Sequence, residues 1–256
     1  MYDFKQQKCW SCMAIMRPSV LAFCLLMLAV LCLSLGIVWI VFASLAKETA
    51  TFRYDNLCEL HHKCTFRFEV EEDMKAPVYL YYRIEGFYQG YRRYFASQSN
   101  GQLQGKNANT FSKLGGCSPR ISEGGDISDP SAVYLPCGLI ATSYFNGKES
   151  SGATPLGLID GRTDTFTLLD DRGRKLDQSS KKVALPTDFS LYKDPGPNTA
   201  GIRVVDSFEN PLFMVWMRAA ALPNFLKLYA IIHEDIDKGV YQMELKNCRG
   251  SSSLAK

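Results

Sequence analysis

The chain has 256 residues, and 26 acidic side chains nearly balance 29 Lys and Arg side chains, which leaves a net charge of +3. This balance excludes a strongly basic nucleic-acid-binding protein, and 46% hydrophobic with 21% charged residues excludes a mainly disordered chain. The length accommodates one large domain or two small ones.

An uncharged segment at residues 18–46 differs sharply from the ordinary polar sequence that follows it. An α-helix needs about 20 apolar residues to cross a hydrocarbon layer of ~30 Å, so this segment predicts one transmembrane helix. The alternative is a cleaved secretory signal, because residues 44–46 place small side chains at a suitable spacing. A signal has an apolar region of only about 7 to 15 residues, which favours the uncleaved anchor.

Charge does not decide the orientation of this helix, because similar numbers of basic residues precede and follow it. Five of the nine cysteines follow the helix: Cys58, Cys64, Cys117, Cys137 and Cys248. If these form disulfides, the larger part of the chain lies outside the cytosol. We therefore expect a cytosolic tail at 1–17, a transmembrane helix at 18–46, an extracytosolic ectodomain at 47–247 and a polar C-terminal stub at 248–256.

Cys58 and Cys64 enclose five residues, which include His61 and His62. This arrangement is compatible with a short disulfide loop, with half of a zinc site or with two free thiols. Zinc knuckles usually have about two to four residues between the ligands and a second matching pair, so the disulfide is favoured over the metal.

The first part of the predicted ectodomain contains two strands and a helix. Residues 65–70 alternate apolar and polar side chains, and 77–82 is an aromatic and β-branched run, so both predict strands. Residues 86–100 place aromatic side chains at helical offsets and predict a helix. The sequence from 100 to 130, which is rich in Gly, Ser, Asn and Pro, predicts a long loop.

Further apolar or alternating segments occupy 134–145 and 163–169, and 188–201 is typical of a turn-rich connector. The segment 211–232 is apolar enough to suggest a second membrane span. However, Arg218 and Lys227 each cost about 2.5 to 3.5 kcal/mol near the centre of a spanning helix. We instead predict a buried strand at 213–217, a turn at 222–223 and an amphipathic segment to residue 232.

No constellation of catalytic side chains is evident in the sequence. Residues 101–106 approach a phosphate-binding loop, but the glycines enclose three residues instead of four, and Asn107 replaces the Ser or Thr that holds magnesium. His233 and Glu234 lack the second histidine of a metalloprotease helix. Asp170 and Asp171 are interpreted as solvated loop charges. We therefore predict no enzyme and no catalytic, cofactor-binding or metal-binding residue.

Tyrosine and arginine side chains gather in one short stretch, at Tyr88, Tyr91, Arg92, Arg93 and Tyr94. Flat rings beside guanidinium groups can stack on bases or bind sugars, but a location outside the cytosol argues against nucleic acid. Two interpretations remain open. One is a packed aromatic face with salt-bridged arginines, and the other is a protein interface, which Tyr and Arg typically anchor.

Several strings of sequence together resemble one known family, in the order in which they occur. They are FKQQ at 4–7, RYDNLC at 53–58, PVYLYYRIEGFYQGYRRYFASQSNGQLQG at 77–105, YLPCGLIATSYFNG at 134–147 and VWMRAAALPNFLKLYAII at 215–232. On these strings the chain is similar to the cell-division-control-protein-50 family, the accessory, non-catalytic subunits of the phospholipid flippases called type IV P-type ATPases. The resemblance covers most of the chain and is weak at 148–205.

The resemblance implies a membrane-anchored, β-rich (α+β) ectodomain with an antiparallel two-sheet core and long insertions, after one N-terminal transmembrane helix. It implies an accessory subunit and chaperone without a cofactor, whose partners are a type IV P-type ATPase catalytic subunit and membrane lipids. Such a subunit supports export from the endoplasmic reticulum and the transport cycle. The expected location is the endoplasmic reticulum, Golgi, endosomal or plasma membrane, with the ectodomain lumenal or extracellular.

Family disulfides map onto Cys58 with Cys64 and onto Cys117 with Cys137. The second bridge closes a loop of about 20 residues, which is worth roughly 3 kcal/mol in the chain-entropy model. For this function, the residues expected to support the fold or face the partner are Phe87, Tyr88, Tyr91, Arg92, Arg93, Tyr94, Trp216 and Arg218.

Three features depart from the family pattern. Family members carry a second transmembrane helix near the C-terminus, whereas this sequence ends at Lys256 with a polar stub, so we expect one span. Cys248 is an extra cysteine, and no Asn-x-Ser/Thr glycosylation sequon occurs. The alternative function is therefore a single-pass ectodomain protein that kept the fold but acts as a receptor or regulatory module without an ATPase.

Overall fold

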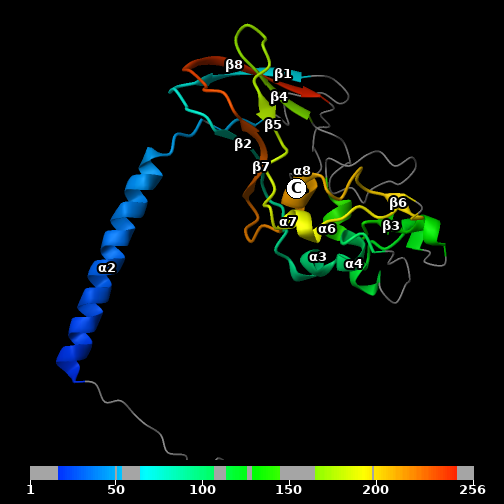
Figure 1. Ribbon diagram of the computed structural model, residues 1–256, viewed down its shortest axis with the longest axis horizontal. Helices are drawn as coiled ribbons and strands as arrows, with labels where there is room; N and C mark the ends of the chain where they lie inside the picture. Colours follow the sequence, from blue (N-terminus) through cyan, green and yellow to red (C-terminus); the bar gives the residue numbers. More distant parts are fainter. Residues whose placement is uncertain are drawn as a thin grey trace, which may run out of the picture. The chain divides into compact units, whose positions relative to one another are not determined.

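The computed structural model describes residues 17–49, 51–53, 64–106, 114–125, 129–144, 165–197 and 199–246 (Figure 1). The chain divides after Glu48 into two compact units, an N-terminal unit and an ectodomain. The N-terminal unit contains one long helix, α2 (Pro18–Leu45). Proline suits its first turn, because the ring fixes a helical φ where the backbone N–H has no partner. This helix is long and apolar enough to cross a membrane, as the sequence predicts.

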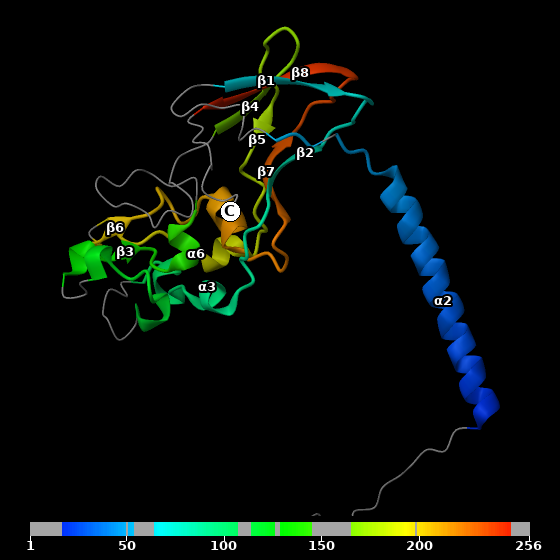
Figure 2. The same ribbon diagram turned by 180° about the vertical axis from the view of Figure 1, so that it is seen from behind.

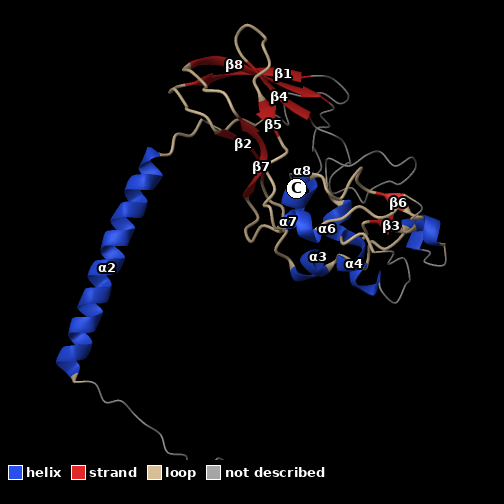
Figure 3. Cartoon of the chain, in the orientation of Figure 1, coloured by secondary structure: helices blue, strands red, loops and turns tan. Residues whose placement is uncertain are grey.

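The ectodomain is built on two small antiparallel sheets (Figures 1 and 3). The first sheet has the order β1 (Cys64–Val70), β8 (Gly239–Lys246) and β4 (Thr165–Leu169), and the second has the order β2 (Val78–Ile84), β7 (Phe225–Ile232) and β5 (Gln178–Ser179). A short parallel pair is formed by β3 (Tyr134–Leu135) and β6 (Ile202–Arg203). Partly buried and exposed residues alternate along β1 and β2, which confirms both predicted strands.

The two sheets share one apolar core. Phe166 and Leu245 of the first sheet are buried in it together with Tyr229 and Ile232 of the second. The rings of Phe166 and Tyr229 meet edge to face with centroids 4.8 Å apart, and the Phe166 backbone amide donates to the Tyr229 hydroxyl. These contacts between the sheets confirm the predicted antiparallel two-sheet core.

Short helices form much of the remaining described ectodomain. They are α3 (Arg92–Ala96), α4 (Asn100–Leu103), η1 (Gly115–Cys117), η2 (Glu123–Gly125), η3 (Pro130–Ala132), α6 (Leu139–Thr142), α7 (Asp188–Leu191) and α8 (Pro211–Met217). Figures 2 and 3 show α3 and α6 at one end of the ectodomain, away from β1 and β8. The predicted long loop at 100–130 is therefore partly helical where it is described.

The first part of the segment 211–232 differs from the prediction, because the strand expected at 213–217 is a helix. Residues 213–217 belong to the helix α8, and the following amphipathic segment is the strand β7. The Asn210 side chain accepts a hydrogen bond from the Leu212 amide at 3.0 Å and so caps α8, and Pro211 occupies its first position. A short apolar run has no periodicity that separates a buried helix from a buried strand, which explains the error.

The helix predicted at 86–100 is also shorter than expected. Only Arg92–Ala96 forms a helix, and Asn100 begins the separate helix α4. Gly86 has a φ of 73°, a left-handed conformation that interrupts a right-handed helix. The aromatic residues at 87–95 therefore occupy a non-helical turn and the short helix α3, rather than one continuous helix.

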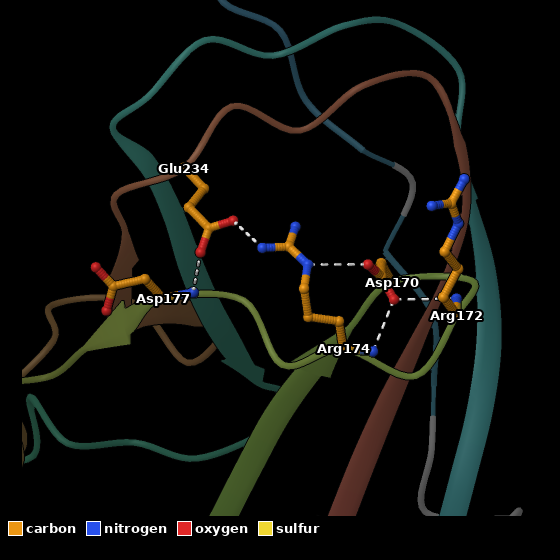
Figure 4. Close-up of polar contacts among 5 residues, drawn as sticks. All are labelled: Asp170, Arg172, Arg174, Asp177 and Glu234. Atoms are coloured by element: carbon orange, nitrogen blue, oxygen red, sulfur yellow. Dashed lines mark hydrogen bonds and ion pairs between the residues drawn. The ribbon is translucent and has the colours of Figure 1, made fainter.

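A polar network joins the turn after β4 to the segment after β7 (Figure 4). One Asp170 oxygen accepts from the backbone amides of Arg172 and Arg174, and the Arg174 guanidinium bridges Asp170 and Glu234. Glu234 also accepts from the Asp177 amide at 2.9 Å. Desolvation raises the pKa of Asp170, but the hydrogen bonds from Arg174 and Arg172 outweigh it and lower the pKa. Asp170 is thus a solvent-accessible loop charge, as predicted, that also holds the turn after β4, and the Arg174–Glu234 ion pair joins this turn to the segment after β7.

Candidate partner-binding surface

The turn after β2 presents tyrosine and arginine side chains to solvent. Tyr88 is 67% exposed and Tyr91 is 63% exposed, whereas Phe87 and Tyr94 are buried. The backbone after β2 is not helical until Arg92, so neighbouring side chains at 87 and 88 point in opposite senses. The predicted Tyr and Arg cluster is therefore split between the surface and the core.

A second segment, between α8 and β7, lies against this turn. The Phe87 amide donates to the Pro223 carbonyl oxygen at 3.0 Å, and the Ala220 amide donates to the Gln89 side-chain oxygen at 3.0 Å. This segment carries Leu222, which is 69% exposed. We call the exposed side chains of the two segments the Tyr-Arg face, which consists of Tyr88, Tyr91, Arg92, Arg93, Phe95 and Leu222.

A cluster of buried aromatic side chains packs behind the exposed residues of the Tyr-Arg face. The Phe87 ring lies 5.4 Å from the Tyr94 ring and 6.0 Å from the Trp216 ring, measured between centroids. Trp216 is fully buried, and its indole nitrogen donates to the Ile140 carbonyl oxygen at 2.8 Å. The Tyr94 hydroxyl pairs with the Ser143 hydroxyl at 2.6 Å, and burial raises the pKa of Tyr94 to about 12. Phe87, Tyr94 and Trp216 therefore occupy structural positions.

Arg218 lies at the end of α8 and forms an ion pair with α7. Its Nη2 is 2.7 and 2.9 Å from the two Asp188 carboxylate oxygens. Asp188 is buried, and its carboxylate also accepts from the Leu185 amide. A buried carboxylate needs such partners to offset the loss of water. The contact places Arg218 as a link between two helices, beside the segment that carries Leu222.

Lys227 is a buried charged residue whose role sequence reasoning missed. Its ammonium group donates to the carbonyl oxygens of Val215, at 3.1 Å, Trp216 and Arg218, and so closes the C-terminal end of α8. The last carbonyl groups of a helix lack a following turn of amides to bond with, and the negative end of the helix dipole favours a cation there. Burial, assisted by the positive charge of Arg218, lowers the pKa of Lys227 to about 8. The only signal in the sequence was a lysine inside an apolar run.

The stability of the full-length protein is expected to rise between about pH 8 and pH 10. An unfolded lysine keeps its proton up to a pKa of about 10.4, whereas Lys227 loses it near 8 in the folded state. The unfolded state then binds more protons, so the free energy of unfolding increases with pH, by about 3 kcal/mol for this pair of values. Above about pH 10 the trend reverses, because burial raises the pKa of Tyr94 and Tyr192 to about 12.

Urea unfolding of the detergent-solubilised protein at closely spaced pH values measures this profile. Lys227→Met should remove the rise, whereas Lys238→Met, which replaces an exposed lysine, should retain it. An identical rise in the Lys227→Met protein would show that another group causes it.

One disulfide joins Cys117 of η1 to Cys137, just before α6. The two Cα atoms are 5.6 Å apart, and both side chains are fully buried beside Leu114 and Val133. This pairing agrees with the one implied by the resemblance. Cys58 lies outside the described residues, so its pairing with Cys64 stays a prediction. Within the described ranges, no group of three or more His, Cys, Asp or Glu side chains is placed to hold a metal ion.

Comparison with known proteins identifies relatives over most of the chain. Residues 42–248 match the model of the LEM3 (ligand-effect modulator 3) family / CDC50 family. Putative ALA-interacting subunit 2 of Arabidopsis thaliana is 29% identical, over 96% of this chain and 73% of that protein. Cell cycle control protein 50C of Bos taurus is 30% identical, over 79% of this chain and 63% of the relative. Phospholipid-transporting ATPase accessory subunit CRF1 of Saccharomyces cerevisiae is 32% identical, over 72% of this chain and 46% of the relative. The family model matches four-fifths of the chain, and the helix α2 is long and apolar enough to cross a membrane. The chain therefore belongs to the LEM3/CDC50 family of membrane proteins.

Proposed function

We propose that this protein is an accessory subunit of a phospholipid-translocating type IV P-type ATPase, and that it acts by binding rather than by catalysis. The family supports this role, because one relative is named as an accessory subunit of a phospholipid-transporting ATPase. The catalytic subunit moves the lipid, and this chain assists its assembly, its export from the endoplasmic reticulum and its transport cycle.

The observation that carries the proposal is the Tyr-Arg face. Tyr and Arg are enriched among the residues that contribute most to binding energy at protein interfaces. Exposed rings that lie over a rigid aromatic core lose little freedom on binding, which lowers the entropic cost of association. We assign Tyr88, Tyr91, Arg92 and Arg93 to partner contact, and Phe87, Tyr94, Trp216 and Arg218 to support of the face.

The charge of the two segments favours a partner surface with acidic or carbonyl-rich groups. No acidic residue occurs from Gly86 to Lys106 or from Asn210 to Ile232. Arg92 and Arg93 are both exposed at the start of α3. Their guanidinium groups can therefore donate to carboxylate or carbonyl oxygens of the ATPase without competition from carboxylates in these two segments.

The buried disulfide supports an ectodomain outside the cytosol, since such bridges form and persist in oxidising compartments. We therefore place the ectodomain in the lumen of the secretory pathway or outside the cell. On this side of the membrane it can contact only the extracytosolic parts of the ATPase.

Affinity purification of the tagged full-length chain in mild detergent tests the proposal. We expect a type IV P-type ATPase at near-equal amounts in the eluate. The double variant Tyr88→Ala/Tyr91→Ala should lower the recovered ATPase by about tenfold or more, as expected when interface hot spots are removed. The matched control is Tyr79→Ala/Tyr81→Ala, which removes two tyrosines of similar exposure from β2.

Equal loss in the two double variants would mean that the Tyr-Arg face is not a specific contact. A well-folded wild-type protein that brings no ATPase would overturn the accessory-subunit role and favour a receptor or regulatory module with the same fold.

A further inference from the structure

We infer that Gln89 is a positioning residue that holds the two segments of the Tyr-Arg face together as one binding surface. The inference rests on the proposed function for its consequence in binding. The contact that it describes, however, can be tested without an ATPase.

Gln89 is a polar side chain that is completely buried between exposed neighbours. Its exposed fraction is 0%, and it follows Tyr88, which is 67% exposed. Burying an amide without hydrogen bonds is costly, so a hydrogen bond that such a side chain does make contributes strongly to its position. Its oxygen accepts from the Ala220 amide, 131 positions away in the chain. The bond therefore joins two segments that are far apart in the sequence and are not linked to each other by a disulfide or a short connection.

Gln89 lies between two residues of the aromatic core in the sequence. Phe87 precedes it by two residues and Tyr94 follows it by five, and both rings are buried with centroids 5.4 Å apart. Among the described residues the Gln89 side-chain nitrogen has no hydrogen-bond partner, so the bond from the Ala220 amide to the side-chain oxygen is the polar contact that fixes this side chain. Gln89 therefore connects the segment that carries Phe87 and Tyr94 to the backbone of the Leu222 segment.

The backbones of the two segments approach closely at position 90, so a larger residue there would displace them by a few tenths of an ångström. A Cβ atom on Gly90 would lie 3.2 Å from the Ala221 carbonyl oxygen and 3.3 Å from that of Ala220. The Gly86 amide adds a hydrogen bond of 3.0 Å to the Asn224 side chain. Gln89 therefore lies within a continuous seam of contacts between the two segments, in which it supplies the one buried side-chain acceptor for the Ala220 amide.

This seam determines how the exposed side chains are presented. Tyr88 and Tyr91 flank Gln89 and Gly90 in sequence, and Leu222 lies two residues after Ala220 on the opposing segment. If the seam opens, the rings and Leu222 move independently and must be ordered again when a partner binds. Loss of preorganisation weakens binding even though no contact residue has been removed.

Gln89→Met tests the inference, because it keeps the length of the side chain and removes the acceptor. The matched control is Gln102→Met: Gln102 is also buried, and it bonds the Cys137 amide at 2.8 Å, away from the face. Hydrogen exchange of the full-length protein in detergent should show faster exchange at 218–224 in Gln89→Met only. Recovery of the ATPase should fall roughly tenfold in Gln89→Met and stay near wild type in Gln102→Met, when equal amounts of folded protein are compared.

A second variant opens the seam without changing Gln89. Gly90→Ala should push the two segments apart by a few tenths of an ångström and reproduce the faster exchange at 218–224. Gly196→Ala is the control, since a Cβ atom there has no neighbour within 4 Å.

The two measurements separate the failure of this inference from failure of the proposed function. Unchanged exchange at 218–224 in both Gln89→Met and Gly90→Ala would overturn the positioning role, whatever the ATPase does. Faster exchange with undiminished ATPase recovery would also overturn it, because the seam would then have no effect on binding. If wild type itself recovers no ATPase, the proposed function fails, and the exchange data alone decide whether Gln89 holds the segments together.

Discussion

Gly138→Ala is expected to prevent stable folding of the ectodomain. Gly138 has a φ of 110°, and a Cβ atom built on it would lie 2.1 Å from the Ser97 carbonyl oxygen and 2.7 Å from its carbonyl carbon. Both atoms belong to the backbone and cannot rotate away. We expect a loss of more than about 4 kcal/mol, which is a large part of the stability of a domain of this size.

The damage should spread because Ser97 holds several segments together. Its hydroxyl donates to the Cys117 carbonyl oxygen at 3.0 Å and accepts from the Leu139 amide at 2.9 Å. Displacing Ser97 would therefore disturb the backbone on both sides of the Cys117–Cys137 bridge. The loss is measured as the fraction of full-length Gly138→Ala protein that resists limited proteolysis or reaches the cell surface, compared with wild type.

Gly124→Ala provides the control for this prediction. Gly124 also has a positive φ, of 71°, but a Cβ atom there meets nothing within 4 Å. Only the conformational strain applies, which costs about 1 kcal/mol. If Gly138→Ala and Gly124→Ala behave alike, close approach of the backbone is not what requires glycine at 138.

Trp216→Ala is expected to cost about 3 to 5 kcal/mol of folding free energy. The fully buried indole fills the space between Phe87 and Tyr144, with ring centroids 6.0 and 6.2 Å away. Removing it leaves a large cavity and an Ile140 carbonyl oxygen without its indole donor. Urea unfolding of the full-length protein, compared at one pH, measures the difference.

Two further variants show which part of the cost comes from the cavity. Trp216→Phe keeps much of the ring volume, so it should lose less stability than Trp216→Ala. Tyr88→Ala removes an exposed ring from the same region and should change stability by less than about 0.5 kcal/mol, although under the proposed function it is expected to weaken partner binding. A stability loss in Tyr88→Ala as large as that in Trp216→Ala would contradict the division between supporting and exposed aromatic residues.

Elements with a clear period could be predicted from the sequence, and those without one could not. The alternation at 65–70 and 77–82 predicts β1 and β2, and the uncharged segment predicts α2. The run at 211–217 has no polar residue to reveal a period, and its helix depends on the Asn210 cap and on burial on several sides. Tertiary contacts decide such segments, and a single sequence does not contain them.

The candidate site was predictable by residue type but not by exposure. The Tyr and Arg cluster at 88–94 was evident, but its division into exposed Tyr88 and buried Tyr94 depends on a turn that the aromatic spacing concealed. Gln89 and Lys227 have partners on distant segments, Ala220 for one and the end of α8 for the other. A single sequence does not reveal such pairings. Polar residues are usually on the surface, and only the fold shows which of them are buried with a partner.

The pairing of early with late strands gives the Tyr-Arg face a further property. The face lies where β2 ends and β7 begins, and these strands come from opposite parts of the chain, as do β1 and β8. In a nascent polypeptide that ends before residue 218, residues 86–96 are already present, but the segment that carries Leu222 and the strand β7 are still missing. Under the proposed function, the complete face forms only after residue 232 has been synthesised and β2 has paired with β7, so the catalytic subunit binds folded chains in preference to incomplete ones.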